Sequence, residues 1–564
     1  MDLQKPLEQS AAGSHSFIWK DSVEPSKGKY PGFRPGLVEH IDGMQVTRDV
    51  AVCMRDGVQI YIDIFLPEDS PSKLPTLMTM SPYGKHVLKT FDMFPNSGVP
   101  KGSVSKHAVW EGPDPLHWTK RGYAVVNADS RGSWASEGNL QVLGPQEAED
   151  GYDVIEWVAV QPWSNSRIGL CGVSYLAIVQ WRIAQLNPPH LSCINPWEGY
   201  TDAFRDHTHC GGIPETKFTK FSDWSCQFSH NQTENWYENN QIHETMDAYN
   251  ESKRAGNLSA ITVPAYIVAD WGDFGLHTRG TLNGYTGISS KQKWLEVHGR
   301  KKWQYYYQPE SLARQEAFYQ KFLKDESSQV DKWPPVRIEV RDRAYVGYVR
   351  EEEDWPIKRT RFSLKYLDAQ SGQLADQSKS KISSTSYDAL STSENAQFTY
   401  VFGKETELTG SMRLRLWVST TEGDDLDLFV QLDKLDVNGE RVPFVAFSMF
   451  DTGPLGLGWL RASHRELDLG LTDHNRPWMT HKRKLPLRPG EIVPIDIEII
   501  ATSTRFLDGE ALKLTIQGTD IFRDERVPQT MLHENTVNSG RHLIHTGTVF
   551  DSYLVMPIID QAAE

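Results

Sequence analysis

The sequence predicts an α/β protein, with a parallel sheet flanked by helices and a second unit built of strands. Between about residues 117 and 200, apolar runs alternate with amphipathic stretches, which is the βαβα order of a parallel sheet. Beyond Trp333-Pro334-Pro335, short runs of alternating apolar and polar residues recur with turn residues between them, which is typical of a β-sandwich or jelly roll. At 564 residues the chain is too long for one core.

The elements of the first unit follow from these patterns in order. We expect an irregular arm over 1–40, and two paired strands between Met44 and Leu66 that turn at Arg55-Asp56-Gly57. Strands and helices of the parallel sheet then follow, at Thr76–Met80, Tyr123–Ala128, Gln146–Val158, Arg167–Cys171 and Ala177–Ala184.

Residues 201–260 change character, because they are polar, aromatic and rich in Asn, Glu and His. We interpret them as a helical insertion over the edge of the sheet. Two apolar strands return at Val263–Ala269 and Lys293–Val297, and a helix at Ser311–Asp325 closes the unit. The predicted divisions are therefore a sheet domain over 41–200 and 261–330, the insertion over 201–260, and the β-sandwich over 331–564.

Bulk composition excludes several classes of function. The formal net charge of -15 disfavours a nucleic-acid partner, since an acidic surface repels phosphates. The sequence has no signal peptide and no apolar run near the ~18 residues that a membrane span needs, so we expect a cytoplasmic protein. Its five cysteines form no CxxC pair, and we expect no disulfide scaffold, metal or other cofactor. The oligomeric state stays open, with a homodimer as one alternative.

The segment Gly172-Val-Ser-Tyr-Leu176 lies between an apolar run and a helix-like stretch. This strand–turn–helix setting is typical of a nucleophile elbow, which exposes the hydroxyl group of a serine, here Ser174. The helix start supplies backbone N–H groups for a developing oxyanion, and the N–H of Tyr175 is the first candidate. The last position of the usual Gly-x-Ser-x-Gly pattern is Leu176 here.

Such a serine needs an acid and a histidine from the ends of later strands. Asp273 follows one apolar strand and His298 follows the next, so we expect the series Ser174, Asp273 and His298. Asp270, His277 and His86 are the alternatives that the sequence leaves open. A second oxyanion donor is expected after Thr76–Met80, where the phenol group of Tyr83 can serve.

Together these residues resemble the cocaine esterase/X-prolyl dipeptidyl peptidase hydrolases of the CocE/NonD type. The resemblance covers most of residues 45 to 555 and depends on motifs at Pro82–Lys85, Asp129–Gly138, Gly172–Leu176, Gln180-Trp181, Leu408–Gly410 and Asp424–Leu428. It implies an α/β-hydrolase domain with an inserted helical cap, a C-terminal jelly-roll domain, and a serine hydrolase that cleaves a carboxylic ester or an amide through an acyl-enzyme. It also implies the same roles for Ser174, Asp273, His298, Tyr83 and Tyr175.

The sequence departs from that family in two places. Leu176-Ala177 replaces the usual Leu-Gly, and the histidine, which in relatives often follows Gly-Pro-Trp-x, here lies in Leu295-Glu-Val-His-Gly-Arg300. Phe274-Gly275 follows the acid where relatives that read an α-amino group place carboxylates, so we expect no recognition of a free amino group. An X-prolyl peptidase is disfavoured because the large N-terminal extension of those enzymes is missing.

We expect a small-molecule substrate with an apolar acyl group, and the aromatic residues Phe274, Trp224, Trp236 and Tyr237 are candidates to line its pocket. Two alternatives remain open. The same residues can serve biosynthetic acyl transfer, lactone or amide formation, or C–C cleavage, because a fold does not fix a reaction. The chain can also be an inactive small-molecule binding module.

Overall fold

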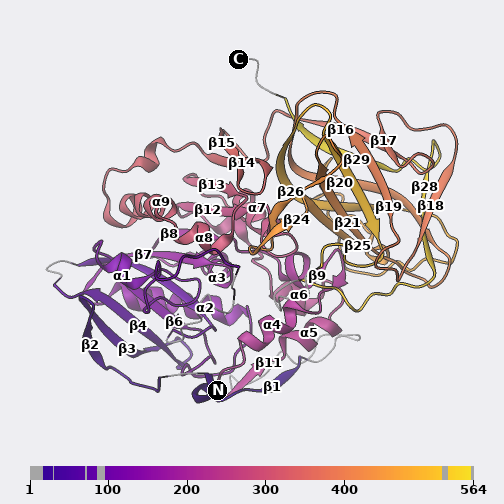
Figure 1. Ribbon diagram of the computed structural model, residues 1–564. Helices are drawn as coiled ribbons and strands as arrows, with labels where there is room; N and C mark the ends of the chain where they lie inside the picture. Colours follow the sequence, from indigo (N-terminus) through magenta and orange to yellow (C-terminus); the bar gives the residue numbers. More distant parts are fainter. Residues whose placement is uncertain are drawn as a thin grey trace.

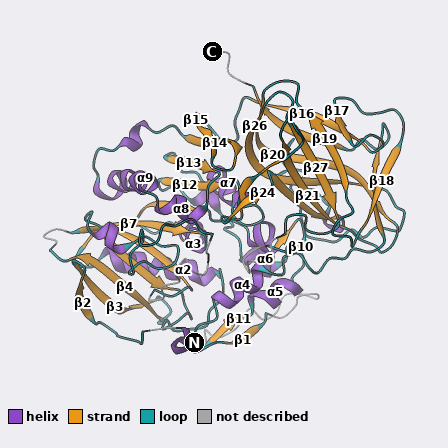
Figure 2. Ribbon diagram, viewed as in Figure 1, coloured by secondary structure: helices purple, strands orange, loops and turns teal. Residues whose placement is uncertain are grey.

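The computed structural model describes residues 17–28, 31–69, 73–85, 94, 96–523 and 531–560. It has two parts, which lie side by side in Figure 1. One is an α/β unit drawn from indigo to pink, and the other is a strand-rich unit drawn in orange and yellow. Figure 2 shows that the helices are concentrated in the first part.

A central sheet organises the α/β unit. Seven neighbouring strands in its middle, from β6 to β14, run parallel, while the remaining strands at its two ends pair antiparallel. Across the sheet the order is β2 (Val38–Ile41), β3 (Met44–Cys53), β4 (Gln59–Pro67), β6 (Ala124–Asp129), β5 (Leu74–Ser81), β7 (Ser164–Val173), β8 (Leu191–Trp197), β12 (Ala265–Asp270), β13 (Lys293–His298), β14 (Val336–Arg343) and β15 (Val346–Glu352). The predicted antiparallel pair is β3 and β4.

Helices cover the faces of this sheet: α1 (Pro115–Thr119), α2 (Pro145–Ala159), α3 (Tyr175–Ala184), α7 (Thr278–Gly287), α8 (Lys302–Tyr307) and α9 (Pro309–Tyr319). All residues of α3 are buried, which explains its nearly continuous apolar sequence. Its two polar exceptions use their hydrogen-bonding groups internally, since Gln180 bonds to the carbonyl of Leu176 and Arg182 to that of Arg254.

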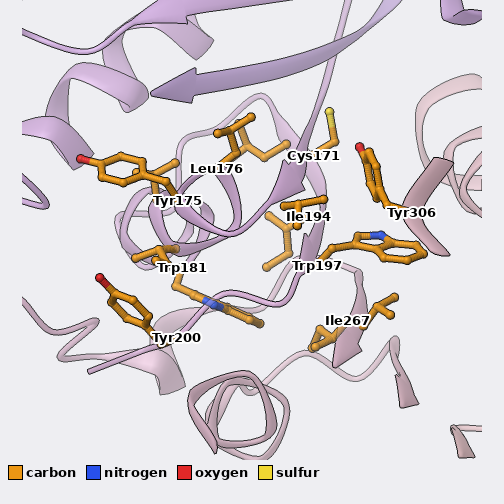
Figure 3. Close-up of a cluster of buried hydrophobic side chains, with 14 of the residues drawn as sticks. Cys171, Tyr175, Leu176, Trp181, Ile194, Trp197, Tyr200, Ile267 and Tyr306 are labelled. Carbon is orange, nitrogen blue, oxygen red and sulfur yellow. The ribbon is translucent and has the colours of Figure 1, made fainter. Parts of the chain in front are cut away.

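The core beneath the predicted elbow joins α3 to three strands (Figure 3). Cys171 of β7, Ile194 and Trp197 of β8, and Ile267 of β12 pack in one cluster with Trp181 of α3. Because this cluster is closely packed around the start of α3, it fixes the strand–turn–helix junction that carries Ser174.

The insertion lies between β8 and β12 and contains α4 (Phe218–Ser225), α5 (Trp236–Ile242) and α6 (Ala248–Ser252), together with β9 (His209–Cys210), β10 (Ile213–Pro214) and β11 (Gln232–Glu234). The N-terminal arm is more regular than the sequence indicates. Its strand β1 (Trp19–Asp21) pairs antiparallel with β11, and β2 already belongs to the central sheet. The rest of the predicted arm includes 1–16, 29 and 30, outside the described residues.

The C-terminal unit contains the strands β16 (Thr360–Asp368), β17 (Gln373–Ala375), β18 (Ser383–Asp388), β19 (Ala396–Val401), β20 (Thr406–Thr420), β21 (Asp427–Leu435), β22 (Arg441–Val442), β23 (Phe444–Ala446), β24 (Phe450–Gly453), β25 (Gly456–Arg461), β26 (Val493–Phe506), β27 (Ala511–Gln517), β28 (Arg541–Thr546) and β29 (Tyr553–Ile559). In β20, Leu414 and Leu416 point into a separate apolar cluster, while Arg413 and Arg415 bond to Asp496, as the two-residue period of a strand requires. The jelly-roll order of these strands stays a prediction.

The predicted C-terminal domain begins at 331, and its first two strands lie in the central sheet. The run from Val336 to Val340 pairs parallel with β13, so β14 and β15 extend the central sheet instead of starting the sandwich. The alternating pattern is the same in either position, which is why the sequence did not separate them. Arg341 of β14 also pairs with Thr504 of β26 and joins the two units. Within the described residues, the structure has no helix long and apolar enough to cross a membrane.

Candidate active site

Ser174 occupies a tight turn between β7 and α3. Its φ of 58° and ψ of -118° are rarely adopted by side-chain-bearing residues, and such backbone strain is concentrated at functional sites. The turn is held from both sides, because the N–H of Ser174 donates to the carbonyl of Trp197 and that of Val173 donates to the carbonyl of Glu111. Only glycine fits at position 172, where φ is 121° and a Cβ atom would lie 2.6 Å from the Cβ of Leu176.

One of the two departures near Ser174, Ala177 in place of the glycine of relatives, is compensated from the opposite side. Ala177 stands where relatives have glycine, and it packs against Gly199, the second residue after β8. A Cβ atom on Gly199 would lie 2.6 Å from the Cβ of Ala177. Helix α3 can therefore still approach the segment after β8 closely, because the residue without a side chain is Gly199 in that segment and not residue 177 of the helix.

The structure brings Ser174, His277 and Asp273 into one series. Oγ of Ser174 lies 3.1 Å from Nε2 of His277, and Nδ1 of the same ring is hydrogen-bonded to Oδ2 of Asp273. His277 is the residue just before α7, and its N–H donates to the carbonyl of Asp273 over 3.1 Å. This turn folds the imidazole back onto the carboxylate four residues earlier.

Charge and burial in this series favour an unprotonated imidazole. Burial, followed by the ammonium group of Lys302, lowers the pKa of His277 to about 4. Burial alone would raise the pKa of Asp273, but Lys302 and His277 hold it well below its usual range. Near neutral pH the ring therefore has a free acceptor at Nε2 and an ionised carboxylate at Nδ1, the arrangement that a general base needs.

The histidine of this series is His277, a correction to the sequence prediction of His298. Nε2 of His298 faces Oε1 of Glu198 at 3.3 Å, and its ring lies against that of Tyr305. Residue 298 ends β13, one strand beyond β12, whereas the turn after β12 places residue 277 beside its own acid. The sequence weighed His277 but placed it inside the next helix, which in fact begins at Thr278. His86 lies outside the described residues.

Lys302 also belongs to the site, and the sequence analysis missed it. Nζ lies 3.2 Å from Oδ2 of Asp273 and 3.4 Å from Nδ1 of His277. Lys302 lies four residues after His298, the last residue of β13, and no motif in the sequence marked it.

Tyr83 and Tyr175, which are expected to supply the two oxyanion donors, are neighbours, with ring centroids 5.5 Å apart. The phenol group of Tyr175 donates to Oε2 of Glu147 over 2.9 Å, so the side chain has a structural partner, and its backbone N–H opens α3. Burial raises the pKa of Tyr83 well above its ordinary value, which keeps its hydroxyl group protonated as a donor.

Asp129 and Trp134, both in the motif Asp129–Gly138, hold the turn that carries Tyr83. The indole N–H of Trp134 donates to the carbonyl of Pro82 over 3.0 Å. The backbone N–H of Lys85 donates to Asp129 over 2.7 Å, and its buried ammonium group lies 3.0 Å from the same carboxylate. These contacts tie both ends of the Tyr83 turn to the end of β6.

The predicted pocket residues are dispersed. Phe274 and Trp236 are fully buried in the core, Trp224 is 45% exposed, and Tyr237 lies beneath the ammonium group of Lys220. A lining role for them stays a prediction. The structure instead groups other aromatic rings next to the site, which the sequence analysis did not select: Tyr200 and His207 beside His277, and Phe94, Trp110, Phe218, Phe221 and Trp303 beyond them.

A serine in the strand–helix turn after β7, in series with a histidine and a buried aspartate from the turn after β12, defines an α/β-hydrolase-type site. Comparisons agree with this class. Residues 56–255 match the X-Pro dipeptidyl-peptidase (S15) family, and residues 328–555 match the X-Pro dipeptidyl-peptidase C-terminal non-catalytic domain. A CocE/NonD family hydrolase from Staphylococcus aureus is 39% identical, with a TM-score of 0.88 over 92% of this chain and 94% of that one. The chain therefore belongs to the CocE/NonD family of serine hydrolases.

Two more relatives are similar over less of the sequence or only in fold. Cocaine esterase from Rhodococcus sp. is 34% identical over 166 residues, which are 29% of this chain and 26% of that protein. The chain thus matches only about a quarter of this curated relative's length. An α-amino acid ester hydrolase, at 16% identity and a TM-score of 0.70 over 93% of this chain, shares the fold.

Proposed function

We propose that this protein hydrolyses a carboxylic ester through an acyl-enzyme, with Ser174 as nucleophile, His277 as general base and Asp273 as the acid that orients the imidazole. The observation that carries the proposal is the 3.1 Å contact between Oγ of Ser174 and Nε2 of His277. A nucleophile and a base within hydrogen-bonding distance of each other disfavour the inactive binding module.

The first half of the reaction acylates the serine. Nε2 of His277 accepts the proton of Ser174 as Oγ attacks the substrate carbonyl carbon, and the carbonyl oxygen becomes an oxyanion. The phenol group of Tyr83 and the backbone N–H of Tyr175 donate to that oxygen. The imidazolium, held by Asp273, then protonates the departing alcohol oxygen as its bond to carbon breaks.

The second half releases the acid. His277 takes a proton from a water molecule, the water oxygen attacks the acyl carbon, and the same two donors hold the second oxyanion. Collapse of this intermediate breaks the bond to Oγ of Ser174, which recovers its proton from His277. The overall change is one ester and one water converted into an acid and an alcohol.

The names of the relatives favour an ester substrate while leaving an amide as the alternative. Cocaine esterase is an esterase by name, and a further relative is a putative Xaa-Pro dipeptidyl-peptidase from Bacillus anthracis. A screen of p-nitrophenyl esters of increasing acyl length, run beside a phenylalanyl-proline amide, separates the two. Hydrolysis of the amide at a rate comparable with the best ester would contradict the ester proposal.

A fluorophosphonate probe tests the residue assignment without knowledge of the substrate. We expect the wild-type protein to be labelled at Ser174, Ser174→Ala to lose the label, and His277→Ala to be labelled at least about a hundredfold more slowly. His298→Ala is the matched control, because it removes the histidine at the neighbouring strand end, and we expect it to retain most of the labelling. Loss of labelling in His298→Ala but not in His277→Ala would reverse the assignment.

A further inference from the structure

Lys302 is a buried cation placed directly against the acid and base of the site. It is the first residue of α8, only 3% of it is exposed, and Nζ contacts both Oδ2 of Asp273 and Nδ1 of His277. Burial of an ammonium group is costly unless opposite charge compensates it. Burial lowers the pKa of Lys302, but the ionised carboxylate of Asp273, 3.2 Å from Nζ, outweighs this effect and raises it above its ordinary value, so Lys302 stays charged.

We infer that Lys302 is a positioning residue that completes a four-membered series with Ser174, His277 and Asp273, sharing the carboxylate with the imidazole and keeping the imidazole unprotonated in acidic solution. This inference depends on the proposed function, in which His277 is the base. It goes beyond that function because it makes Lys302, which does not contact the nucleophile, the residue that sets the lowest pH at which the site still reacts.

The geometry supports two effects of the ammonium group. Oδ2 of Asp273 receives both Nδ1–H of His277 and an N–H of Lys302, and two donors on one oxygen fix the carboxylate against rotation. The proton on Nδ1 points to Asp273, so Nζ, at 3.4 Å, meets the ring as a like charge whenever Nε2 is also protonated. The cation therefore opposes formation of the imidazolium in the resting site.

Other titratable groups face His277 from the neighbouring elements. Glu198 and Tyr200 lie after β8 and His207 lies in the π-helical turn Phe204–Thr208. Burial lowers the pKa of His207 to about 3, and burial together with Asp273 raises that of Glu198 well above its ordinary value, so both favour the neutral form in mildly acidic solution.

Tyr200 stacks on the imidazole and is neutral, because burial raises the pKa of its phenol group. Arg279, two residues along α7, is neutralised by its ion pairs with Asp206 and Glu498. Asp273 thus attracts a proton to His277, and Lys302 is the nearby charge that opposes it.

The test is the pH dependence of the fluorophosphonate labelling rate at Ser174, which needs no substrate. In the wild-type protein we expect the rate to fall only near pH 4, where His277 becomes protonated. In Lys302→Met the midpoint of this fall should move up by one pH unit or more. If the midpoint reaches pH 6, the labelling rate at pH 5 is about a tenth of its plateau value. Lys302→Arg keeps a cation, so its labelling rate should fall at the same pH as that of the wild-type protein.

Lys301→Met is the matched control, since it removes an adjacent lysine whose Nζ pairs with Asp451 at 3.0 Å and not with the site. This variant should show the same fall of the labelling rate at low pH as the wild-type protein. The inference is overturned if Lys302→Met is folded, as judged by thermal unfolding, and its labelling rate falls at the same low pH as that of the wild-type protein. If Lys302→Met does not fold, Lys302→Gln takes its place.

A second readout separates failure of this inference from failure of the proposed function. The pKa of the His277 ring can be followed by NMR in histidine-labelled protein, with its signal assigned by its loss in His277→Gln. If the wild-type protein is never labelled at Ser174, the proposed hydrolase fails, yet an upward shift of the His277 titration in Lys302→Met still supports the role of Lys302. An unchanged titration contradicts it independently of activity.

Discussion

Arg279 of α7 forms an ion pair with Glu498 of β26, with 3.0 Å between Nη1 and Oε2. The same guanidinium group lies 2.7 Å from Asp206 in the insertion. Because His277 immediately precedes α7, these two contacts tie the helix that presents the proposed base to both of the other parts of the molecule. The C-terminal unit therefore helps to position the base, although it contributes no residue to the series.

Removal of Arg279 should destabilise the protein by about 3–5 kcal/mol, since Arg279→Met leaves two buried carboxylates without their cation. Urea unfolding measures this loss. Arg483→Met is the matched control, because Arg483 pairs with Glu466 at the surface and is 68% exposed, so its loss should change the free energy of unfolding far less. Equal effects in the two variants would contradict a structural role for the Arg279 contacts.

A methyl group at position 199 should disturb the turn that carries Ser174. The added Cβ of Gly199→Ala would lie 2.6 Å from the Cβ of Ala177 and 2.8 Å from its carbonyl carbon, so α3 must shift. We expect slower fluorophosphonate labelling and a lower melting temperature. The double variant Gly199→Ala/Ala177→Gly removes the first contact but not the second, and it should recover part of both losses. No recovery at all would mean that Ala177 is not the residue that Gly199 accommodates.

Loss of the Tyr83 hydroxyl group should slow acylation more than it weakens substrate binding. Removal of one oxyanion donor costs about 3 kcal/mol, so Tyr83→Phe should reduce kcat about a hundredfold with little change in KM. Tyr175→Phe is the comparison, because its phenol group bonds to Glu147 and its backbone donor is unaffected. That variant should lose stability while keeping a larger share of kcat. A smaller effect on kcat in Tyr83→Phe than in Tyr175→Phe would exclude Tyr83 as the side-chain donor.

Glu147 should make folding stability depend on pH below neutrality. Burial raises its pKa from 4.5 to about 7, although Ser130 and Tyr175 both donate to it. A carboxyl group with a raised folded pKa gives a stability contribution that is fully present below pH 4.5 and is lost as the pH rises through 7. The loss amounts to about 3 kcal/mol.

The variant Glu147→Gln removes this titration while retaining a neutral acceptor. The stability of the wild-type protein relative to Glu147→Gln should therefore fall by about 3 kcal/mol between pH 4 and pH 8, as measured by urea unfolding at each pH. A difference that stays constant over this range would show that folding does not raise the pKa of Glu147.

Much of the architecture follows from local sequence patterns. The strand–turn–helix around Ser174 was predictable because an apolar run, Gly172 and an apolar helix are adjacent in the chain. The place of β14 was not predictable in the same way. An alternating strand has the same pattern whether it ends one sheet or begins another, and only the pairing with β13 decides between them.

The histidine assignment failed for a different reason. The rule that triad residues follow strand ends selects Asp273 as the acid and, by the same reasoning, His298 as the base. The rule contains no information on the direction in which each side chain points. The deciding fact is that α7 begins at Thr278, so that His277 lies in the turn before the helix and its ring folds back onto Asp273. Helix boundaries are the least certain feature of a sequence pattern, and here a shift of a few residues decides which histidine reaches Ser174.

The backbone bond from the N–H of His277 to the carbonyl of Asp273 makes the proposed acid and base a single local unit. Ser174, by contrast, is 103 residues away from His277 along the chain. Any rearrangement of the loop after β12 therefore carries both partners away from the hydroxyl group in concert. Such a site would switch off completely and return intact, without passing through a state in which the imidazole has lost its carboxylate.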